Sequence, residues 1–241
     1  MPEDFNMSAQ LAHTTAHNAI VYDIRMSQRA TGATPTAHEA VLDLFQGMGA
    51  RMTFERDAEI FGEGEPADFV YRVASGAVRT YRVLSDGRRQ IGDFHLAGDL
   101  FGLECGREHL FGAEAICRSE IIVCRRSSLF GLAARSPDVG HALWAETARE
   151  LERAQSHLML LGRKSACERV ATFLAALAER EPVNREITLP MSRQDMADYL
   201  GLTIETVSRT FPQLQSEGVI ELHGCRKVQV LSAAALSRLS N

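Results

Sequence analysis

The chain has 241 residues, of which 45% are hydrophobic and 24% charged, and its formal net charge is −5. That length suits one large or two small domains with ordinary apolar cores. The sequence has no apolar run of the roughly 18 residues that a transmembrane helix needs, and its first residues lack the basic and apolar segments of a secretory signal. Five cysteines without a CxxC pair indicate reduced thiols rather than a disulfide framework. We therefore expect a cytoplasmic protein with no membrane partner.

The acidic charge is concentrated in the front of the chain. Residues 1–159 hold 16 basic and 22 acidic residues, whereas residues 160–241 hold 10 and 9. Nucleic-acid-binding proteins are often basic overall, so the bulk charge argues mildly against that class. Because the last third of the chain is close to neutral, it stays compatible with a nucleic-acid partner.

The first half of the chain changes from a polar arm to a pattern of short strands. Residues 1–35 are rich in Ala, Thr, Ser, Gln and His, which predicts a flexible arm. An apolar stripe predicts a helix over residues 36–49. From residue 52 to about residue 126, short alternating segments are broken by glycine, and Asp86-Gly87 is a strong hairpin turn. This spacing indicates a β-barrel or jelly roll.

A long amphipathic helix is expected over residues 137–162. Apolar residues recur there at spacings of three and four, and those we assign to one seam are Trp144, Leu151, Ala154, Leu158 and Leu161. One reading is a helix that packs only on its own domain. The length of the stripe and the charges beside it favour a seam between two copies of the chain.

Residues 192–209 have the pattern of a helix, a glycine turn and a second helix. Ser192 and Thr203 are good caps for the two helices, and Gly201 follows the last apolar residue of the first, where a positive φ is often needed. In the second helix, Ile204 and Val207 are expected to face inward. Its polar residues are expected to face a partner and are Glu205, Thr206, Ser208 and Arg209.

Residues 219–222 and 227–231 are predicted to form a hairpin. A hairpin that directly follows a helix-turn-helix is a wing. Its tip carries Arg226 and Lys227, which are well placed to bind phosphates. The full set that we assign to a DNA backbone is Ser192, Arg193, Thr203, Thr206, Arg226 and Lys227.

Taken together and in this order, these features resemble the CRP/FNR family of bacterial transcription regulators over about residues 36–240. The β-roll glycines of that family correspond to Gly64, Gly76, Gly87, Gly98 and Gly102. The resemblance implies an α+β fold with an N-terminal β-roll (jelly roll), a long dimerisation helix and a C-terminal winged helix-turn-helix. The implied domains are a flexible arm (1–35), a β-roll (36–135), the dimerisation helix (136–162) and a DNA-binding domain (163–241).

The segment 205–209 matches the E-x-x-S-R recognition pattern of the FNR and FixK branch. Arg209 can donate two hydrogen bonds to guanine, Glu205 can accept one from cytosine, and Ser208 can contact a base or a phosphate. The resemblance implies a palindromic TTGAT…ATCAA-like site that a homodimer reads, one half-site per subunit. The alternative is that Glu205 and Arg209, at i and i+4, form only an exposed ion pair.

The expected effector sites of the family are incomplete. Leu103 follows Gly102 where nucleotide-binding members have Glu, and no Arg-Ser or Arg-Thr pair follows before Ala115, so a cyclic phosphate would lack its arginine. The first 104 residues contain no cysteine, although a [4Fe–4S] cluster needs about four thiolates. We therefore expect no cofactor and no metal, as in the FixK subgroup.

For that subgroup the resemblance implies an activator that recruits RNA polymerase to genes for low-oxygen life and nitrogen metabolism. A second hypothesis is a regulator of the same type whose β-roll binds an unidentified small molecule. An enzyme is not expected, because the sequence has no P-loop, no G-x-S-x-G, no HExxH and no Cys/His zinc pattern.

Two residues in the expected DNA-binding part, Cys225 and Pro212, depart from the pattern around them. Cys225 lies in the wing beside two basic residues, which makes it a candidate redox site, although a turn cysteine without a role is the simpler reading. Pro212 falls in the expected interior of the recognition helix, where it cannot donate to the carbonyl of Ser208. That helix is expected either to kink or to end just past Arg209.

Overall fold

The computed structural model describes residue 45 and residues 47–104, 106–180 and 185–240. The predicted arm over residues 1–35 and most of the predicted helix over residues 36–49 lie outside these residues; within the latter, Phe45, Gly47 and Met48 are helical. The described residues form two compact units. The first contains those up to Thr80 and residues 94–150, and the second contains residues 81–93 and those from Leu151 onward.

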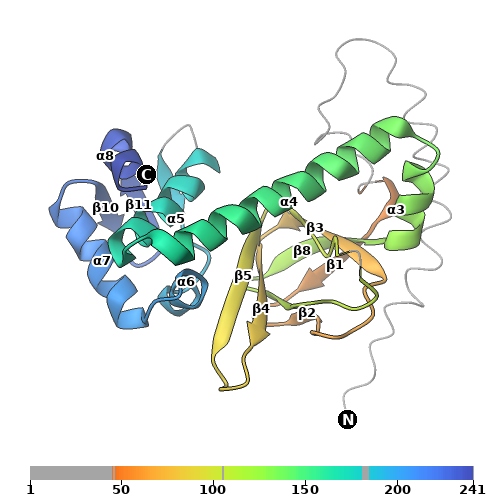
Figure 1. Ribbon diagram of the computed structural model, residues 1–241, viewed down its shortest axis with the longest axis horizontal. Helices are drawn as coiled ribbons and strands as arrows, with labels where there is room; N and C mark the ends of the chain where they lie inside the picture. Colours follow the sequence, from red (N-terminus) through yellow and green to blue (C-terminus); the bar gives the residue numbers. More distant parts are fainter. Residues whose placement is uncertain (1–44, 46, 105, 181–184, 241) are drawn as a thin grey trace. The chain divides into compact units, whose positions relative to one another are not determined.

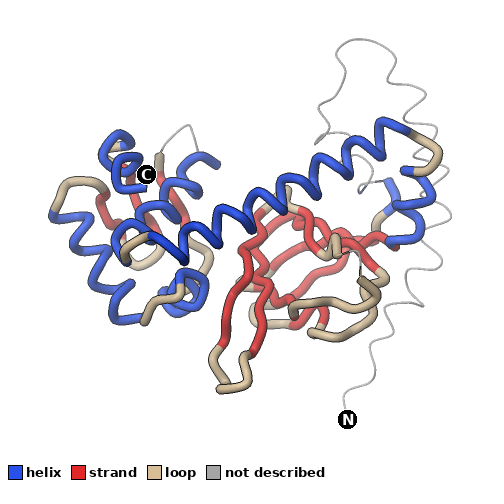
Figure 2. The backbone as a smooth tube through the Cα atoms, viewed as in Figure 1, coloured by secondary structure: helices blue, strands red, loops and turns tan. Residues whose placement is uncertain are grey.

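Two four-stranded sheets form the β-roll (Figures 1 and 2). One has the order β1-β8-β3-β6, with strands Ala50–Phe54, Ser119–Arg125, Phe69–Ser75 and Leu100–Phe101. The other has the order β2-β7-β4-β5, with strands Glu59–Phe61, Gly112–Ala115, Ala77–Val83 and Arg89–Leu96. The predicted turn at Asp86-Gly87 joins β4 to β5, and Gly87 has the positive φ of 83° that such a turn requires.

Alternation along the central strands explains why the first sheet is covered on both faces. Tyr71, Val73 and Val123 belong to a cluster that includes residues from both sheets. Their neighbours Val70 and Cys124 belong to a second cluster, which includes residues of helices α3 (Arg126–Ala133) and α4 (Pro137–Arg163). Successive residues of a strand point to opposite faces, so each strand contributes to both cores.

Helix α4 is the long helix that the apolar spacing predicts. It has 27 residues, which corresponds to a length of about 40 Å. None of the described helices is long and apolar enough to cross a membrane.

The C-terminal part of the second unit is a small sheet with four helices. The helices are α5 (Ala166–Arg180), α6 (Arg193–Leu200), α7 (Ile204–Ser216) and α8 (Ala233–Ser240). The sheet has the antiparallel order β10-β11-β9, with strands Ile220–His223, Lys227–Val230 and Glu186–Thr188. The predicted α+β fold, with a β-roll, a long helix and a winged helix-turn-helix, is confirmed.

Candidate nucleic-acid interface

Helix α6 begins with a reciprocal capping box. The Asp195 amide donates to the Ser192 hydroxyl at 3.0 Å, and the Ser192 amide donates to the Asp195 carboxylate at 3.0 Å. Both contacts satisfy amides that have no partner within the helix. The helix ends at Gly201, whose φ of 60° lies in the left-handed region that glycine adopts most easily.

Helix α7 begins at the cap Thr203, whose hydroxyl accepts from the Thr206 amide at 3.3 Å. Val207, Phe211 and Leu214 are almost completely buried and anchor one face of the helix. The expectation that Ile204 also faces inward is wrong, because its side chain is 38% exposed. Ile204 lies in the first turn of the helix, and the buried face begins at Val207, about one turn later.

The opposite face of α7 presents the three predicted base-reading residues. Glu205, Ser208 and Arg209 are all exposed. No described residue forms an ion pair or a side-chain hydrogen bond with any of them, so the alternative of an intrahelical Glu205–Arg209 pair is not formed. An acceptor, a hydroxyl and a fork of guanidinium donors therefore lie on one exposed face, which is the arrangement that base edges require.

Pro212 does not end the helix. Helix α7 continues to Ser216, so the expectation of an end just past Arg209 is wrong. Pro212 lies on the exposed face, whereas its neighbour Phe211 and the next-turn residue Leu214 are buried. Packing of these two side chains holds the last turns in a helix, although the Ser208 carbonyl loses its amide donor.

The wing is a hairpin of β10 and β11, with Gly224 at a φ of 77° in its turn. Cys225 and Arg226 are exposed at the tip. Lys227 donates to the Glu186 carboxylate of β9 at 2.8 Å. Of the two predicted phosphate ligands, Arg226 has no ion pair with a described residue, whereas Lys227 already has one.

The other predicted backbone contacts also have roles within the motif. The Arg193 guanidinium carbon lies 3.2 Å from the centre of the Phe211 ring, and burial lowers the pKa of Arg193 to about 10, so it stays charged at neutral pH. Ser192 and Thr203 are the helix caps, and the Thr206 hydroxyl lies 3.0 Å from that of Thr203. The cation–π contact joins α6 to α7 and holds the two helices in a fixed relation.

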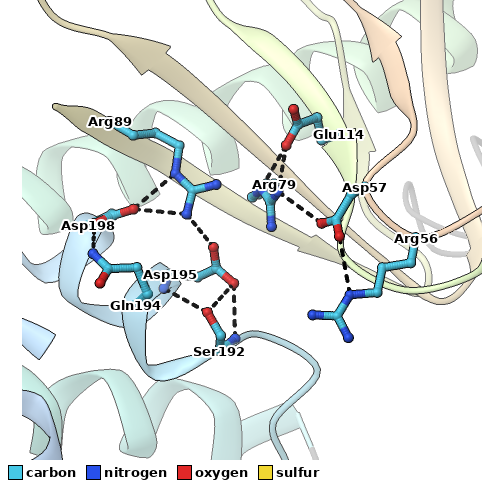
Figure 3. Close-up of polar contacts among 9 residues, drawn as sticks. All are labelled: Arg56, Asp57, Arg79, Arg89, Glu114, Ser192, Gln194, Asp195 and Asp198. Atoms are coloured by element: carbon cyan, nitrogen blue, oxygen red, sulfur yellow. Dashed lines mark hydrogen bonds and ion pairs between the residues drawn. The ribbon is translucent and has the colours of Figure 1, made fainter. Parts of the chain in front are cut away.

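Two further arginines join this region, and the sequence analysis predicted the contacts of neither. Arg169 on α5 donates to the carbonyl oxygens of Leu161, Lys164 and Leu200, each at 2.9 Å. Arg89 on β5 contacts Asp195 and Asp198 of α6 (Figure 3). The only sequence signal for Arg169 is a charge directly beside the buried position Val170. Arg89 follows the predicted turn at Asp86-Gly87, but no sequence signal connects it to α6.

One face of α4 is apolar and exposed. The exposed fractions are 75% for Trp144, 58% for Leu151, 70% for Leu158 and 64% for Met159, and Ala154 is exposed as well. Of the predicted seam residues, only Leu161 is half-buried within the chain, where it lies beside Gly201. Residues 144, 151 and 158 are one heptad apart, which is the period that keeps a seam on one side of a helix.

Aromatic side chains fill the interior of the β-roll. The ring of Tyr71 lies 4.9 Å from that of Phe61 and 5.1 Å from that of Phe101, and His109 stacks on Phe61 at 3.7 Å. Gly102 has a φ of 75°, and a Cβ added there would lie 2.8 Å from the Tyr71 ring. The backbone at Gly102 is therefore packed directly on the aromatic cluster.

In the segment where an effector site is expected, Leu103 is apolar and packed, and Glu104 is already paired. Leu103 packs on the cluster that contains Val70 and Cys124. The following residue, Glu104, lies 3.4 Å from Nδ1 of His109. Neither residue offers an anion the positive partner that a phosphate needs.

The described cysteines do not fit an iron–sulfur cluster. Cys124 is 1% exposed in an apolar core, and burial raises the pKa of its thiol to about 11. Within the described ranges, no group of three or more His, Cys, Asp or Glu side chains is arranged to hold a metal ion. A cluster would need several thiolates at one place.

Comparisons with known proteins agree with this geometry. Residues 51–136 match the cyclic nucleotide-binding domain family, and residues 168–239 match the Crp-like helix-turn-helix domain family. The chain is 45% identical to the nitrogen fixation regulation protein FixK of Azorhizobium caulinodans, over 90% of each chain. It is 43% identical to FixK of Rhizobium meliloti, over 78% of this chain and 86% of that one.

A solved structure, that of FixK2 from Bradyrhizobium japonicum, superimposes with a TM-score of 0.78. It is 48% identical in sequence, and the match covers 80% of this chain and 98% of that one. The chain is thus not an enzyme; it belongs to the CRP/FNR family of DNA-binding transcription regulators, among the FixK-like members.

Proposed function

We propose that the protein is a homodimeric transcription activator that reads a palindromic TTGAT…ATCAA-like site, with one α7 helix in the major groove of each half-site. The observation that carries this proposal is the exposed face of α7. Its Glu205, Ser208 and Arg209 have no side-chain partner among the described residues. A folded protein that leaves a carboxylate and a guanidinium one turn apart and unpaired has both available for base edges.

The apolar stripe on α4 supports the homodimer. Trp144, Leu151 and Leu158 are each more than half exposed, and a second copy of the same helix would remove them from water. Large apolar side chains in a row are uncommon on the surface of a monomer. We propose the organisation of the domains as an arm (1–35), a β-roll (36–135), the dimer helix (136–162) and a DNA-binding domain (163–241).

The β-roll supports an activator that works without an effector. Aromatic rings occupy its interior, and Leu103 stands where a phosphate-binding member has a carboxylate. The second candidate is a regulator gated by an unidentified ligand, which the match to the cyclic nucleotide-binding family favours. Calorimetry with cyclic AMP and cyclic GMP, together with a visible absorption spectrum of the purified protein, separates the two candidates.

The names of the relatives support the biological role. Because FixK proteins are nitrogen fixation regulators, we propose that this chain acts in the cytoplasm on genes for low-oxygen life and nitrogen metabolism. Activation requires RNA polymerase as a partner at the promoter.

Cys225 is a candidate redox site within this proposal. Its thiol is exposed at the wing tip beside Arg226, so oxidation would place bulk or negative charge where phosphates are bound. The test is DNA affinity before and after peroxide in the parent and in Cys225→Ala. Loss in the parent alone supports the role, and equal loss in both removes it.

The experiment that tests the proposed function is selection of bound DNA from a random pool by the full chain. The expected product is an inverted repeat of a five-base half-site with one fixed spacing. Recovery of a single half-site, or of no consensus, would contradict the proposal that a homodimer binds the site.

A further inference from the structure

The turn between β4 and β5 is a well-ordered structure that ends in Arg89. The Leu84 amide donates to the Arg88 carbonyl at 2.8 Å, and the Gly87 amide donates to the Leu84 carbonyl at 2.9 Å. The Asp86 carboxylate accepts from the Arg88 amide at 3.0 Å and from its side chain at 2.7 Å. These contacts hold the turn, so that Arg89 extends from a defined backbone.

Arg89 binds two aspartates on successive turns of α6 (Figure 3). Its Nη2 lies 2.6 Å from Asp195 Oδ1, and its Nε lies 2.9 Å from Asp198 Oδ2. The side chains of Asp195 and Asp198 are only 5% and 13% exposed, and that of Arg89 is 25% exposed. Two charge-assisted contacts from one planar fork, largely shielded from water, are both strong and directional.

Both aspartates are held by α6 itself, so the contact cannot slide along the helix. Asp195 forms the capping box with Ser192, and Asp198 Oδ1 accepts from the side-chain Nε2 of Gln194 at 2.6 Å. An arginine that binds two fixed carboxylates defines a direction as well as a distance. Arg89 thus sets the orientation of α6 with respect to the turn.

The same helix is held from α4. The His157 ring stacks on Tyr199 of α6 at 4.0 Å, and its Nε2 lies 2.9 Å from the Tyr199 carbonyl oxygen. Arg153 of α4 lies 3.5 Å from Asp93 of β5. Strand β5, helix α4 and helix α6 therefore form one connected set of polar and aromatic contacts.

We infer that Arg89 is a positioning residue for DNA binding: its contacts with Asp195 and Asp198 hold the helix-turn-helix in the orientation that sets the spacing between the two half-sites. Gly201 and the Arg193–Phe211 contact connect α6 firmly to α7, so a rotation of α6 moves the base-reading residues. A regulator without an effector needs its recognition helices already oriented. The contacts of Arg89 with Asp195 and Asp198 provide that orientation. The inference rests on the proposed homodimer.

The test measures spacing selectivity with the full chain. Two DNA duplexes carry the same half-sites, one at the spacing that selection gives and one with two extra base pairs, which turn one half-site by about 70° around the helix axis. The ratio of the two affinities is the readout. Because both duplexes are titrated against one protein sample, the ratio does not depend on the folded fraction.

The variants are Arg89→Met and Asp198→Asn, and Asp198 is chosen because it is not part of the capping box. Each variant is expected to lose about 5- to 150-fold in affinity for the selected spacing, the usual range for coupled sites. It should lose much less for the altered spacing, so that the ratio falls toward one. The control Arg163→Met removes the same charge from an exposed arginine that has no side-chain contact with a described residue, and it should leave the ratio unchanged.

Arg89→Lys keeps the charge without the planar fork and should recover part of the ratio. If Arg89→Met and Asp198→Asn both keep the affinity ratio of the parent protein, the inference is overturned and the proposed function still stands. If the parent protein binds both spacings with equal affinity, the proposed homodimer is overturned, and this inference with it.

Discussion

Arg169 of α5 donates to the carbonyl oxygen of Leu200, the last residue of α6, at 2.9 Å. The same guanidinium donates to the carbonyl oxygen of Leu161 near the end of α4, also at 2.9 Å. The last carbonyls of a helix have no partner within it, and a positive charge there also favours the helix dipole. The Arg169 side chain thus caps the C-terminal ends of both α4 and α6.

Arg169→Ala is expected to lower the free energy of unfolding of the C-terminal unit by at least about 2 kcal/mol, because several hydrogen bonds to a charged donor are lost together. Urea unfolding followed by circular dichroism measures the change. Arg163→Ala is the control, since Arg163 is an exposed arginine without a side-chain contact to a described residue. Equal effects of the two substitutions would remove the capping role of Arg169.

Pro212→Ala is expected to raise the free energy of unfolding by up to about 3 kcal/mol, the usual difference between proline and alanine inside a helix. Alanine restores the amide donor to the Ser208 carbonyl, and Pro212 is exposed, so no packing is lost. Denaturant unfolding measures the gain, with Gln215→Ala as an exposed control on the same helix. A loss of stability would mean that the proline fits this helix better than its chemistry suggests.

Local patterns predicted most of the fold and the exposed face of α7 that we propose to read bases. The caps Ser192 and Thr203, the glycine at position 201 and the hairpin after α7 are signals within a few residues of one another, and the structure has each of them. The order of the strands in the two sheets was not predicted, because it depends on pairing between distant segments.

Long-range side-chain contacts were not predictable either. Arg89 lies 106 residues from Asp195 and 109 from Asp198 in the sequence, and no spacing rule connects them. Pro212 shows the opposite limit. Its local rule predicted a kink or an early end, and the helix continues past it to Ser216 with Phe211 and Leu214 buried.

Leu158→Glu is expected to convert the proposed homodimer to a monomer and to abolish tight binding to a two-half-site duplex. A charge in the centre of an apolar seam must be desolvated without a partner. Leu158 is 70% exposed within the chain, so the fold itself should be unaffected. Sedimentation velocity measures the assembly state, and Ser156→Glu adds the same charge to an exposed position off the seam. A dimeric Leu158→Glu protein would place the interface elsewhere.

Arg226→Ala is expected to weaken binding to specific and random DNA alike and to lower the salt slope by up to about one unit, because one phosphate contact is lost. Lys227→Ala should have a smaller effect, since Lys227 already pairs with Glu186. Fluorescence anisotropy at several salt concentrations measures both slopes. A change confined to one DNA sequence would assign Arg226 to base reading instead.

The central claim is that the exposed face of α7 reads base edges, and Arg209→Ala tests it most directly. Affinity is measured for the selected palindrome and for the same duplex with each base pair of the half-site changed in turn. The substitution is expected to cost about 1–3 kcal/mol at the palindrome and to flatten the preference at one base pair only. An unchanged preference at every position would contradict the assignment of Arg209 and of the face that carries it.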